Sequence, residues 1–297
     1  MTVQHKYRGI MTATPTPFTA NGQIDTAAIA AHVDRMIAAD ADALVPLGGT
    51  GEYTSLTSAQ RMTVLETSVK AADGRIPVIP GVLSPGIGNA TEAGRAFMKA
   101  GANALMVVTP YYFRPTQQGI VDYFKKFSDE VDADIILYEI PYRTGVSLNY
   151  QTVAQLAAET RVVGMKACNP DLAQQMRVAE LTRNKIAILT GEEDVLPLHV
   201  AMGAVGAIIS SSNLVPRQWA RILKLAMDGQ LTEAMALHTA LRPLIDCVFA
   251  EPNPAPIKAA MELLGWGGSD VLAPMLPASA ALRERLTKIV TEHRGRE

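Results

Sequence analysis

The sequence predicts a (β/α)8 barrel followed by a helical C-terminal extension. Eight short apolar runs recur along the chain, with starts between residues 9 and 205 and a mean spacing of (205 − 9)/7 = 28 residues. Stretches with helical periodicity separate these runs, and after Met227 only helical patterns follow. Eight strand–helix units in about 225 residues match the size of such a barrel.

The apolar runs are predicted to form the barrel strands because they are nearly continuous in apolar residues and do not alternate with polar ones. Parallel strands that are covered on both faces have this composition. The predicted strands are 9–14, 43–47, 76–80, 104–108, 135–138, 162–166, 186–189 and 205–209.

The intervening segments are predicted to be helices because apolar residues recur in them every three or four positions. In the first of them, Ile29, Val33 and Met36 fall on one face. Thr57 followed by Gln60 has the spacing of a capping box at the start of the second. The predicted helices are 26–39, 57–72, 116–131, 171–182, 193–202 and 216–227, with 231–249, 255–264 and 278–291 in the extension.

Two domains are expected, a barrel over residues 1–229 that carries the active site and a three-helix extension over residues 230–297. The alternative fold is a doubly wound open sheet. It has fewer strands and usually a glycine-rich dinucleotide loop after the first strand. Here the first predicted strand leads into Thr-Pro-Thr-Pro-Phe at 14–18, which is no such loop.

Composition and charge narrow the class of protein. Lys and Arg number 27 against 29 Asp and Glu, so the net charge is −2, and neither a nucleic acid nor a membrane is an expected partner. Two cysteines, Cys168 and Cys247, exclude a disulfide framework. The N-terminal residues lack the apolar core of a signal peptide, and no apolar stretch reaches the ~20 residues of a membrane span. We therefore expect a cytoplasmic protein with no cofactor and no metal, since metal-ligand spacing is absent among the histidines at 5, 32, 199, 238 and 293.

Lys166 is the most informative single residue because it ends the sixth predicted strand, after Val-Val-Gly-Met. In such barrels the catalytic groups lie where strands end and loops begin. Burial of an ammonium is costly unless it is paired, and it lowers the amine's pKa, which frees the nitrogen to attack a carbonyl. Lys166 therefore predicts Schiff-base chemistry. The structural alternative is an ion pair with Glu139 or Glu192.

Other polar residues follow the predicted strands. Tyr138 ends the fifth, where it is either a core tyrosine or a proton relay beside Lys166. The loop 48–51, Gly-Gly-Thr-Gly, is either a tight turn or a backbone cradle for a carboxylate. Arg143 is either a solvated side chain or a bidentate clamp for a substrate carboxylate. The acidic run 192–194 is expected to cap the N-terminus of a helix, in preference to holding a cation.

Five motifs carry a family resemblance over nearly the whole chain. They are Gly-Gly-Thr-Gly-Glu at 48–52, Thr-Pro-Tyr-Tyr at 109–112, Tyr-Glu-Ile-Pro-Tyr-Arg-Thr-Gly at 138–145, Gly-Met-Lys at 164–166 and Glu-Pro-Asn-Pro-Ala-Pro-Ile-Lys at 251–258. Together and in this order they resemble the dihydrodipicolinate synthase / N-acetylneuraminate lyase family of class I aldolases. The resemblance implies that Lys166 forms an imine with pyruvate or another 2-oxo acid, and that Tyr138 relays protons. It also implies that Thr50 and the backbone of Gly49 bind the 2-oxo acid carboxylate.

The resemblance extends to the second substrate and to assembly. Arg143 resembles the synthase-type arginine that holds the carboxylate of aspartate semialdehyde. Gly191 and Ile208 are expected to line the pyruvate pocket. Tyr112 resembles the tyrosine that reaches into a neighbouring subunit's site, which implies a homotetramer built as a dimer of dimers.

The chain departs from the synthase pattern at specific positions. Gly49 stands at the first threonine of Gly-Thr-Thr-Gly-Glu, so a water would have to replace one link of the hydroxyl relay. Its Gly-Gly-Thr-Gly-Glu form resembles the sugar-acid dehydratases of the family, whose loop after the fifth strand lacks Arg-Thr-Gly. Glu139 stands where asparagine is usual, and Lys166 is followed by Ala-Cys-Asn-Pro-Asp instead of Glu-Ala-Thr-Gly-Asp. These departures allow a different acceptor aldehyde.

The expected function is a Schiff-base-forming lyase that condenses pyruvate with an aldehyde. The first candidate is the synthesis of 4-hydroxy-tetrahydrodipicolinate with L-aspartate semialdehyde. The alternatives are an aldolase or dehydratase of 2-oxo-3-deoxy sugar acids, and a lapsed enzyme that binds 2-oxo acids or serves as a scaffold. The joint presence of Lys166, Tyr138, Tyr112 and Arg143 argues against a lapsed site.

The resemblance also bears on inhibition by lysine. Lysine-inhibited members of the family bind lysine at a dimer interface. Tyr111 is kept there, while Arg61, Pro85 and Asn89 stand where those members have a histidine, an asparagine and a glutamate. Without that carboxylate the ligand's ammonium loses its strongest contact. We therefore expect no inhibition by millimolar lysine.

Overall fold

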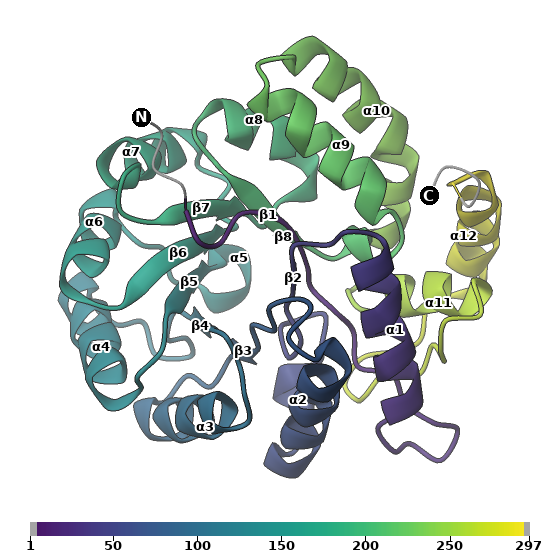
Figure 1. Cartoon of the computed structure of the whole chain (residues 1–297), viewed down its shortest axis with the longest axis horizontal. Coiled ribbons are helices and arrows are strands. Elements are labelled where there is room, and N and C mark those ends of the chain that lie inside the picture. The colour runs from purple at the N-terminus through teal and green to yellow at the C-terminus, as the bar shows by residue number, and fades with distance from the viewer. Residues whose placement is uncertain (1–4, 294–297) are drawn as a thin grey trace.

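Eight parallel strands form the wall of a barrel in the computed structural model, which describes residues 5–293. Figure 1 shows the strands at the centre of a ring of helices. The strands are β1 (Gly9–Thr12), β2 (Ala43–Leu44), β3 (Gly81–Val82), β4 (Leu105–Val108), β5 (Ile135–Glu139), β6 (Val162–Ala167), β7 (Ala187–Thr190) and β8 (Gly206–Ile209).

The sheet closes on itself, which confirms the predicted fold class. Regular pairing runs in the order β2-β1-β8-β7-β6-β5-β4-β3, and every pair is parallel. Backbone hydrogen bonds join the two ends of this order. Leu44 N donates to Pro77 O at 2.9 Å, Ile79 N donates to Leu44 O at 2.8 Å and Gly81 N donates to Pro46 O at 2.9 Å. No open sheet edge is therefore left between β2 and β3.

The third strand differs from the prediction, which placed it at residues 76–80. Regular pairing in β3 covers only Gly81–Val82. Pro77 and Pro80 have no backbone N–H to donate to a ladder, and Val78 N instead donates to the side chain of Asn103 at 2.8 Å. The predicted run therefore lies in the barrel wall, but most of it is not regular strand.

Helices cover the outside of the barrel, and side-chain caps mark several of their starts. Asp25 accepts from Ala28 N at 2.9 Å, and Thr57 and Gln60 form the predicted capping box. Thr116 and Asp171 cap two more helices. The helices around the strands are α1 (Thr26–Ala38), α2 (Ser58–Ala72), α3 (Ile87–Lys99), α4 (Gln117–Glu130), α6 (Tyr150–Glu159), α7 (Leu172–Thr182), α8 (Leu196–Ala201) and α9 (Pro216–Met227).

Several short elements at the loops were not predicted. Besides α3 and α6, for which no bounds were predicted, the structure has a four-residue helix, α5 (Pro141–Thr144), directly after β5. The predicted helix 193–202 is divided into the 3-10 turn η2 (Glu193–Val195) and α8. Two further 3-10 turns are η1 (Tyr53–Ser55) and η3 (Ser211–Asn213).

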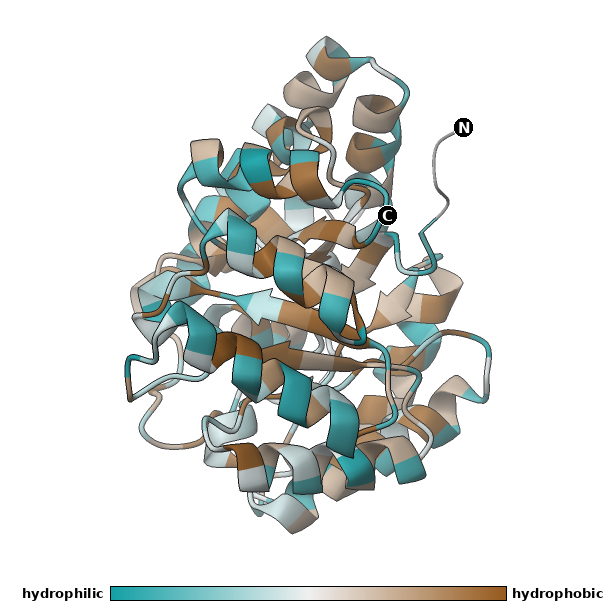
Figure 2. Ribbon diagram, turned by 90° about the vertical axis from the view of Figure 1, so that its left-hand side faces the viewer, coloured by the Kyte–Doolittle hydropathy of each residue, from teal (hydrophilic) through white to brown (hydrophobic). Residues whose placement is uncertain are grey.

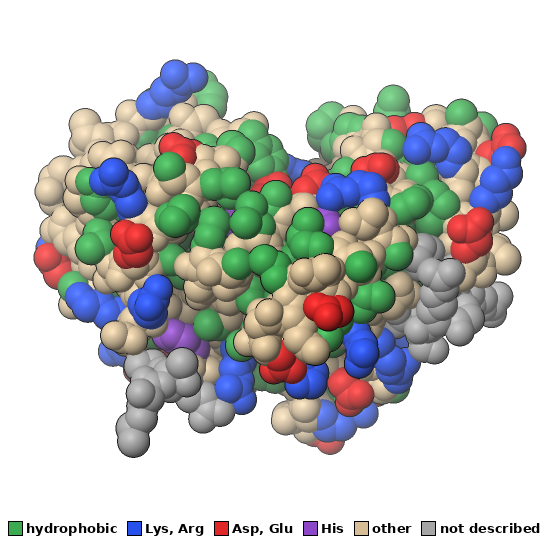
Figure 3. All heavy atoms as spheres, turned by 90° about the horizontal axis from the view of Figure 1, so that it is seen from above, with side chains coloured by type: hydrophobic (Ala, Val, Ile, Leu, Met, Phe, Trp, Pro, Cys, Tyr) green, Lys and Arg blue, Asp and Glu red, His purple; other side chains and the backbone are tan. Residues whose placement is uncertain are grey.

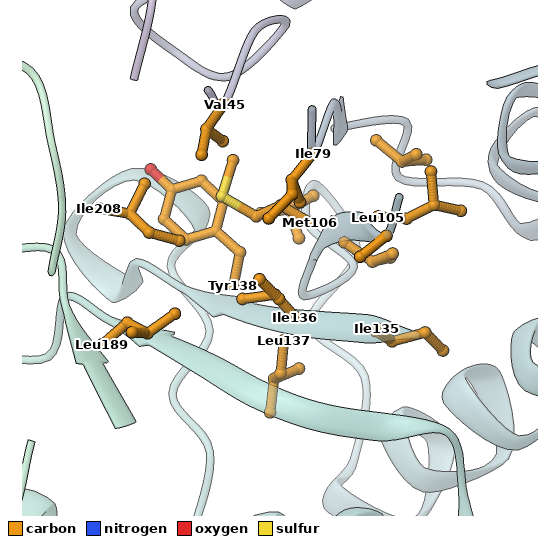
Figure 4. Packing of buried hydrophobic residues seen from close by; sticks show 14 of the residues in the cluster. Val45, Ile79, Leu105, Met106, Ile135, Ile136, Leu137, Tyr138, Leu189 and Ile208 are labelled. Carbon is orange, nitrogen blue, oxygen red and sulfur yellow. The ribbon is translucent and has the colours of Figure 1, made fainter. Parts of the chain in front are cut away.

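The core is divided between the barrel and its junction with the extension. One cluster fills the barrel and the space beneath α1 to α7, and Figure 4 shows part of it, with the Tyr138 side chain beside Met106 and Ile208. A second cluster, which includes the fully buried Trp219, joins β1 and β8 to the C-terminal helices. In Figure 2 the central strands are mostly hydrophobic, while the helices carry hydrophilic residues on their outer sides. This is the composition expected of parallel strands buried on both faces.

The extension consists of α10 (Leu231–Val248), α11 (Ala255–Leu263) and α12 (Ala280–His293). These helices lie together beside α1 and α9 in Figure 1. Residues 1–4 of the predicted barrel domain and 294–297 of the predicted extension lie outside the described residues.

Charge on the surface is mixed. Acidic and basic side chains are interspersed among hydrophobic ones on the face shown in Figure 3. Within residues 5–293, no helix combines the length and apolar character that crossing a membrane requires.

Candidate active site

A cavity of about 50 Å³ opens at the carboxyl ends of the strands. The side chains or backbone that line it come from β5, β6 and β8 and from the loops after β2 and β7. Seven of the eight residues predicted for the site line this cavity, namely Gly49, Thr50, Tyr138, Arg143, Lys166, Gly191 and Ile208.

Lys166 and Tyr138 are direct neighbours because they are register partners on β6 and β5. Partners on adjacent parallel strands point to the same face of the sheet. Lys166 Nζ accordingly lies 4.6 Å from the centroid of the Tyr138 ring. Both side chains are buried, with Lys166 9% and Tyr138 4% exposed.

The amine of Lys166 has no carboxylate partner. Of the residues that the structure describes, no Asp or Glu lies within ion-pair distance of its nitrogen. The structural alternative from the sequence is therefore wrong, because Glu139 binds other groups and Glu192 accepts a hydrogen bond from Tyr142 at 2.9 Å. Burial lowers the pKa of Lys166, and the nearby positive charge of Arg143 lowers it further. A larger share of the neutral, nucleophilic amine follows.

Tyr138 remains a phenol under ordinary conditions. Burial raises the pKa of Tyr138 well above its usual value, while the positive charge of Arg143 opposes this rise. A hydroxyl that keeps its proton both donates and accepts hydrogen bonds. This is the protonation state that a relay beside an amine requires.

Gly191 makes room for the lysine. A Cβ built at Gly191 would lie 2.8 Å from Lys166 Cε and would also collide with Cys168 Sγ. Any larger residue there would displace the side chain at the centre of the cavity. Cys168 is a lining residue that sequence reasoning did not identify, and burial raises its pKa, so it stays a thiol.

The loop after β2 approaches its neighbours closely at two glycines, with backbone in the way of a side chain at Gly51 and the flexible end of Arg143 at Gly49. A Cβ at Gly51 would lie 2.6 Å from the backbone nitrogen of Leu47, and one at Gly49 would lie 2.8 Å from Arg143 Nη1. The Thr50 hydroxyl between them accepts a hydrogen bond from Asn253 Nδ2 at 2.9 Å. Asn253 and Phe249 come from the extension and also line the cavity. In the sequence, only the family motif at 251–258 pointed to this segment.

Arg143 stands between this cavity and a larger one. It belongs to α5, and its backbone N–H donates to Ile140 O at 3.0 Å. It lines both the Lys166 cavity and a neighbouring cavity of about 290 Å³, which Tyr111, Pro274 and Met275 also border. The residue as a whole is exposed to solvent. A ligand in the larger cavity would therefore lie beside Arg143 and next to the cavity that holds the Lys166 amine.

Tyr112 does not line the cavity of its own chain. Its side chain is 86% exposed, and its backbone φ of +75° lies in the left-handed region. The ring packs edge-on against Phe113, with centroids 5.3 Å apart, and Phe113 is itself 80% exposed. Two adjacent exposed aromatic rings form an apolar projection from the loop after β4.

Glu139 lies at the end of β5 on the side away from Lys166. Its carboxylate accepts hydrogen bonds from Leu148 N at 2.8 Å, Asn169 Nδ2 at 3.0 Å and Gln175 Nε2 at 3.5 Å. It is 1% exposed, and burial raises its pKa. Glu139 thus joins the loop that follows Arg143 to the loop that follows Lys166, a role that the sequence did not reveal.

The acidic run 192–194 lies at the start of η2, as expected of residues at a helix N-terminus, but the side chain of Glu192 forms no capping hydrogen bond. Glu192 binds the Tyr142 hydroxyl, and Asp194 pairs with Arg242. Glu193 is buried and accepts hydrogen bonds from Ser210 N at 2.7 Å and Ser211 N at 3.0 Å. The three carboxylates therefore have separate partners. Glu193 points into the core, where backbone N–H groups at the start of η3 are available.

The four residues considered for lysine binding do lie together. Arg61, Pro85, Asn89 and Tyr111 line another cavity, of about 380 Å³, between α2 and α3, which borders the larger cavity at Tyr111. Arg61 stacks on the Tyr53 ring, with its Cζ 3.8 Å from the centroid. The expectation that no carboxylate lies there is wrong, because Glu92 also lines this cavity. Insensitivity to lysine stays a prediction, resting on Arg61 and Pro85 alone.

No metal centre accompanies these cavities. Between residues 5 and 293, no three His, Cys, Asp or Glu side chains lie close enough to hold an ion together.

The fold and the site define a (β/α)8 barrel with an unpaired, buried lysine beside a tyrosine, at the carboxyl ends of neighbouring strands. A family model described as the dihydrodipicolinate synthetase family matches residues 6–293. The chain therefore belongs to this family.

Individual relatives agree over almost their full length. A protein named 4-hydroxy-tetrahydrodipicolinate synthase from Methanothrix thermoacetophila is 35% identical over 288 residues, which cover 95% of this chain and 97% of the relative. Another of that name from Sorangium cellulosum is 37% identical over 282 residues, 94% of each chain. The solved structure of dihydrodipicolinate synthase from Thermotoga maritima has a TM-score of 0.94 and 34% identity, covering 98% of this chain and 99% of that one.

A structure of the Acinetobacter baumannii dihydrodipicolinate synthase complexed with pyruvate is also similar. Its TM-score is 0.92 at 28% identity, and the match covers 97% of this chain and 99% of that one.

Proposed function

We propose that this protein condenses pyruvate with an aldehyde through an imine on Lys166, and that L-aspartate semialdehyde is the first candidate for the aldehyde. The product would then be 4-hydroxy-tetrahydrodipicolinate, as in the relatives of that name. The observation that carries the proposal is the buried Lys166 amine, which has no carboxylate partner and lies over Tyr138. An amine in this environment is a nucleophile, whereas a structural lysine would be paired.

The first half-reaction follows from the lining of the small cavity. Thr50 and the backbone of Gly49 bind the pyruvate carboxylate, and Gly191 and Ile208 border the rest of the molecule. The Lys166 amine adds to C2 of pyruvate to give a carbinolamine. Tyr138 donates a proton to the leaving hydroxyl, so that water departs and the imine forms.

The second half-reaction uses the larger cavity. Loss of a proton from C3 of the imine gives an enamine, whose C3 attacks the carbonyl carbon of the aldehyde. Arg143 holds the carboxylate of the aldehyde, because a guanidinium matches a carboxylate with two parallel hydrogen bonds. The amino group of the semialdehyde then attacks C2, which closes the ring and releases Lys166.

Tyr112 and the oligomer form a linked part of the proposal. The exposed Tyr112 and Phe113 project from the loop after β4, and a large exposed apolar group favours a protein interface. We assign Tyr112 to the active site of a neighbouring subunit in a homotetramer. Tyr112→Phe should lower kcat without altering assembly, and sedimentation velocity of the wild type should give a tetramer. A monomer with full activity would contradict this assignment.

One observation favours the alternative substrate class within the family. Gly49 provides no hydroxyl for the relay of the synthase pattern, and Arg143 Nη1 lies 2.8 Å from the place of a Cβ at position 49. A 2-oxo-3-deoxy sugar acid would bring its own hydroxyls to this place. The alternative substrate reaction is therefore cleavage or dehydration of such an acid, through the same imine.

Trapping of the imine tests the proposal. Pyruvate with borohydride should add one covalent mass to the wild type, and peptide mapping should place it on Lys166. Lys166→Arg keeps a cation but should lose both trapping and turnover, whereas the exposed Lys224→Arg should keep both. An adduct on another lysine, or none at all, would contradict the proposal. A screen of aldehydes and sugar acids then separates the substrate classes.

The cytoplasmic location remains a prediction from the sequence.

A further inference from the structure

We infer that Asn253 is a positioning residue, which turns the hydroxyl proton of Thr50 toward the carboxylate of the 2-oxo acid. The inference rests on the proposed function, because it concerns how that carboxylate is bound. It assigns part of the substrate-binding geometry to the C-terminal extension, which carries Asn253.

The direction of one hydrogen bond is the first observation. Asn253 Nδ2 donates to Thr50 Oγ1 at 2.9 Å. The amide nitrogen is only a donor, so the hydroxyl oxygen must act as the acceptor and its single proton must point elsewhere. Among residues 5–293, no group accepts that proton. Thr50 is 6% exposed and lines the cavity of Lys166, so a ligand in this cavity is the acceptor within reach.

The second observation is the other end of the same amide. Asn253 Oδ1 is buried and has no hydrogen-bond partner in the described part of the chain. A buried acceptor without a partner is unfavourable, and a residue with a purely structural role would be expected to satisfy it. Asn253 lines both the Lys166 cavity and the larger cavity beside Arg143. Its position at the junction of the two is that of a substrate-site residue.

A buried ion pair holds the extension in this position. Lys258 Nζ donates to Glu52 Oε1 at 2.7 Å and to Thr16 O at 2.8 Å, and Leu272 N donates to Glu52 Oε2 at 2.7 Å. The two side chains are 1% and 2% exposed. Glu52 lies two residues after Thr50, and Lys258 lies five residues after Asn253. The ion pair therefore fixes the same two segments that the Asn253–Thr50 hydrogen bond joins.

A double-mutant cycle on pyruvate binding tests the inference. We expect Asn253→Ala to raise the KM for pyruvate by about 2- to 10-fold, the range of one neutral hydrogen bond, with a smaller change in kcat. In a Thr50→Val background the same substitution should change KM little, because no hydroxyl remains to be oriented. Asn253→Ser serves as a second truncation in case the alanine variant does not fold, which thermal melting would reveal.

Asn253→Asp provides the sharper test because an ionised carboxylate accepts the Thr50 proton and turns it away from the substrate. This variant should bind pyruvate more weakly than Asn253→Ala. The loss relative to wild type should shrink at low pH, where a protonated Asp can donate to Thr50 Oγ1.

Three outcomes would overturn the inference. One is an Asn253→Ala effect of equal size with and without the Thr50 hydroxyl. Another is an Asn253→Asp variant with wild-type KM, which would show that position 253 accepts the hydroxyl proton. The third is a wild type that pyruvate and borohydride do not label, and this outcome alone also defeats the proposed function.

Discussion

The absence of a side chain at Gly49 leaves space that the Arg143 guanidinium occupies. Gly49 has no side chain, and Arg143 Nη1 lies 2.8 Å from the point where a Cβ would be. The Arg143 guanidinium therefore lies close to the loop that is proposed to bind the pyruvate carboxylate. Gly49 thus lacks the relay hydroxyl and also leaves room for the Arg143 guanidinium.

Gly49→Ala should weaken binding of the second substrate while sparing the first. The added Cβ pushes the guanidinium away, and a charged hydrogen bond is worth about 1.5–3 kcal/mol, so we expect KM for the aldehyde to rise by about tenfold or more. Pyruvate trapping should change little because the backbone N–H of residue 49 is kept. Gly88→Ala is the matched control, since nothing lies within 4 Å of a Cβ there. An unchanged aldehyde KM in Gly49→Ala would contradict this reading of the contact.

The pH dependence of imine formation should respond in opposite directions to two charges near Lys166. Burial lowers the pKa of Lys166, Arg143 lowers it further, and Glu192 raises it. Arg143→Met should therefore raise the pKa and move the rise of the trapping rate to higher pH. Glu192→Gln should lower the pKa and move that rise to lower pH. Rates of borohydride trapping across a pH series measure both, and shifts of the same sign would refute the electrostatic account.

At the scale of the secondary-structure element, two successive residues at the end of β5 point to opposite sides of the sheet and have different roles. Tyr138 faces the cavity, and Glu139 faces the loops behind it, because successive residues of a strand point to opposite sides. The Glu139 carboxylate joins Leu148 N and Asn169 Nδ2. Glu139, which stands where asparagine is usual, thus holds the loops behind the site together and forms no ion pair with Lys166.

We expect the Glu139→Gln variant to lose less stability than the wild type as the pH rises. Burial raises the pKa of Glu139, so the folded state holds its proton to a higher pH than the unfolded state does. Stability contributed by this group is full below the unfolded pKa of about 4.3 and is lost as pH rises through the folded pKa. Melting temperatures of both proteins from pH 4 upward measure the slope.

The control for this prediction has the opposite sign. A hydrogen bond from Lys125 lowers the pKa of the exposed Glu159, so its contribution is present above the unfolded pKa and lost as pH falls through the folded pKa. Glu159→Gln should therefore reduce the gain of stability with pH. Identical slopes in wild type and Glu139→Gln would show that burial does not perturb Glu139.

At the scale of the whole molecule, a buried ion pair joins the barrel and the extension. Lys258 on α11 and Glu52 after β2 form the buried pair, and Glu52 also binds the backbone of Leu272. The Lys258 ammonium lies 4.2 Å from the centroid of the Phe18 ring. Removal of one partner would leave the other charge buried and unpaired.

Lys258→Met should lower the free energy of unfolding by about 3–5 kcal/mol, the usual cost of breaking a buried ion pair from one side. Glu52→Gln combined with Lys258→Met should recover part of this loss, because no charge then remains buried. Lys224→Met removes an exposed pair with Asp228 and should cost no more than about 0.5 kcal/mol. Denaturant unfolding compares the three. Equal effects of Lys258→Met and Lys224→Met would show that burial of the pair has no energetic consequence.

The sequence by itself determined the class of fold and the centre of the site. Strand and helix periodicities are local, so eight strands, the Thr57–Gln60 capping box and helix 216–227 were predictable. Lys166 and Tyr138 were predictable as neighbours because each ends a strand, and parallel strands end at the same rim. The third strand was misplaced because apolar character does not show that Pro77 and Pro80 lack donors for a ladder.

Outside the Lys166–Tyr138 pair, only the tertiary structure decided which polar groups meet. Asn253 and Thr50 are 203 positions apart, and Lys258 and Glu52 are 206 positions apart. The partners of Glu139 also depend on how separate loops pack together, as does the absence, among residues 5–293, of an ion pair at Lys166. No periodicity or spacing encodes such contacts, because they form only when the closed barrel and the C-terminal helices bring distant segments into van der Waals contact.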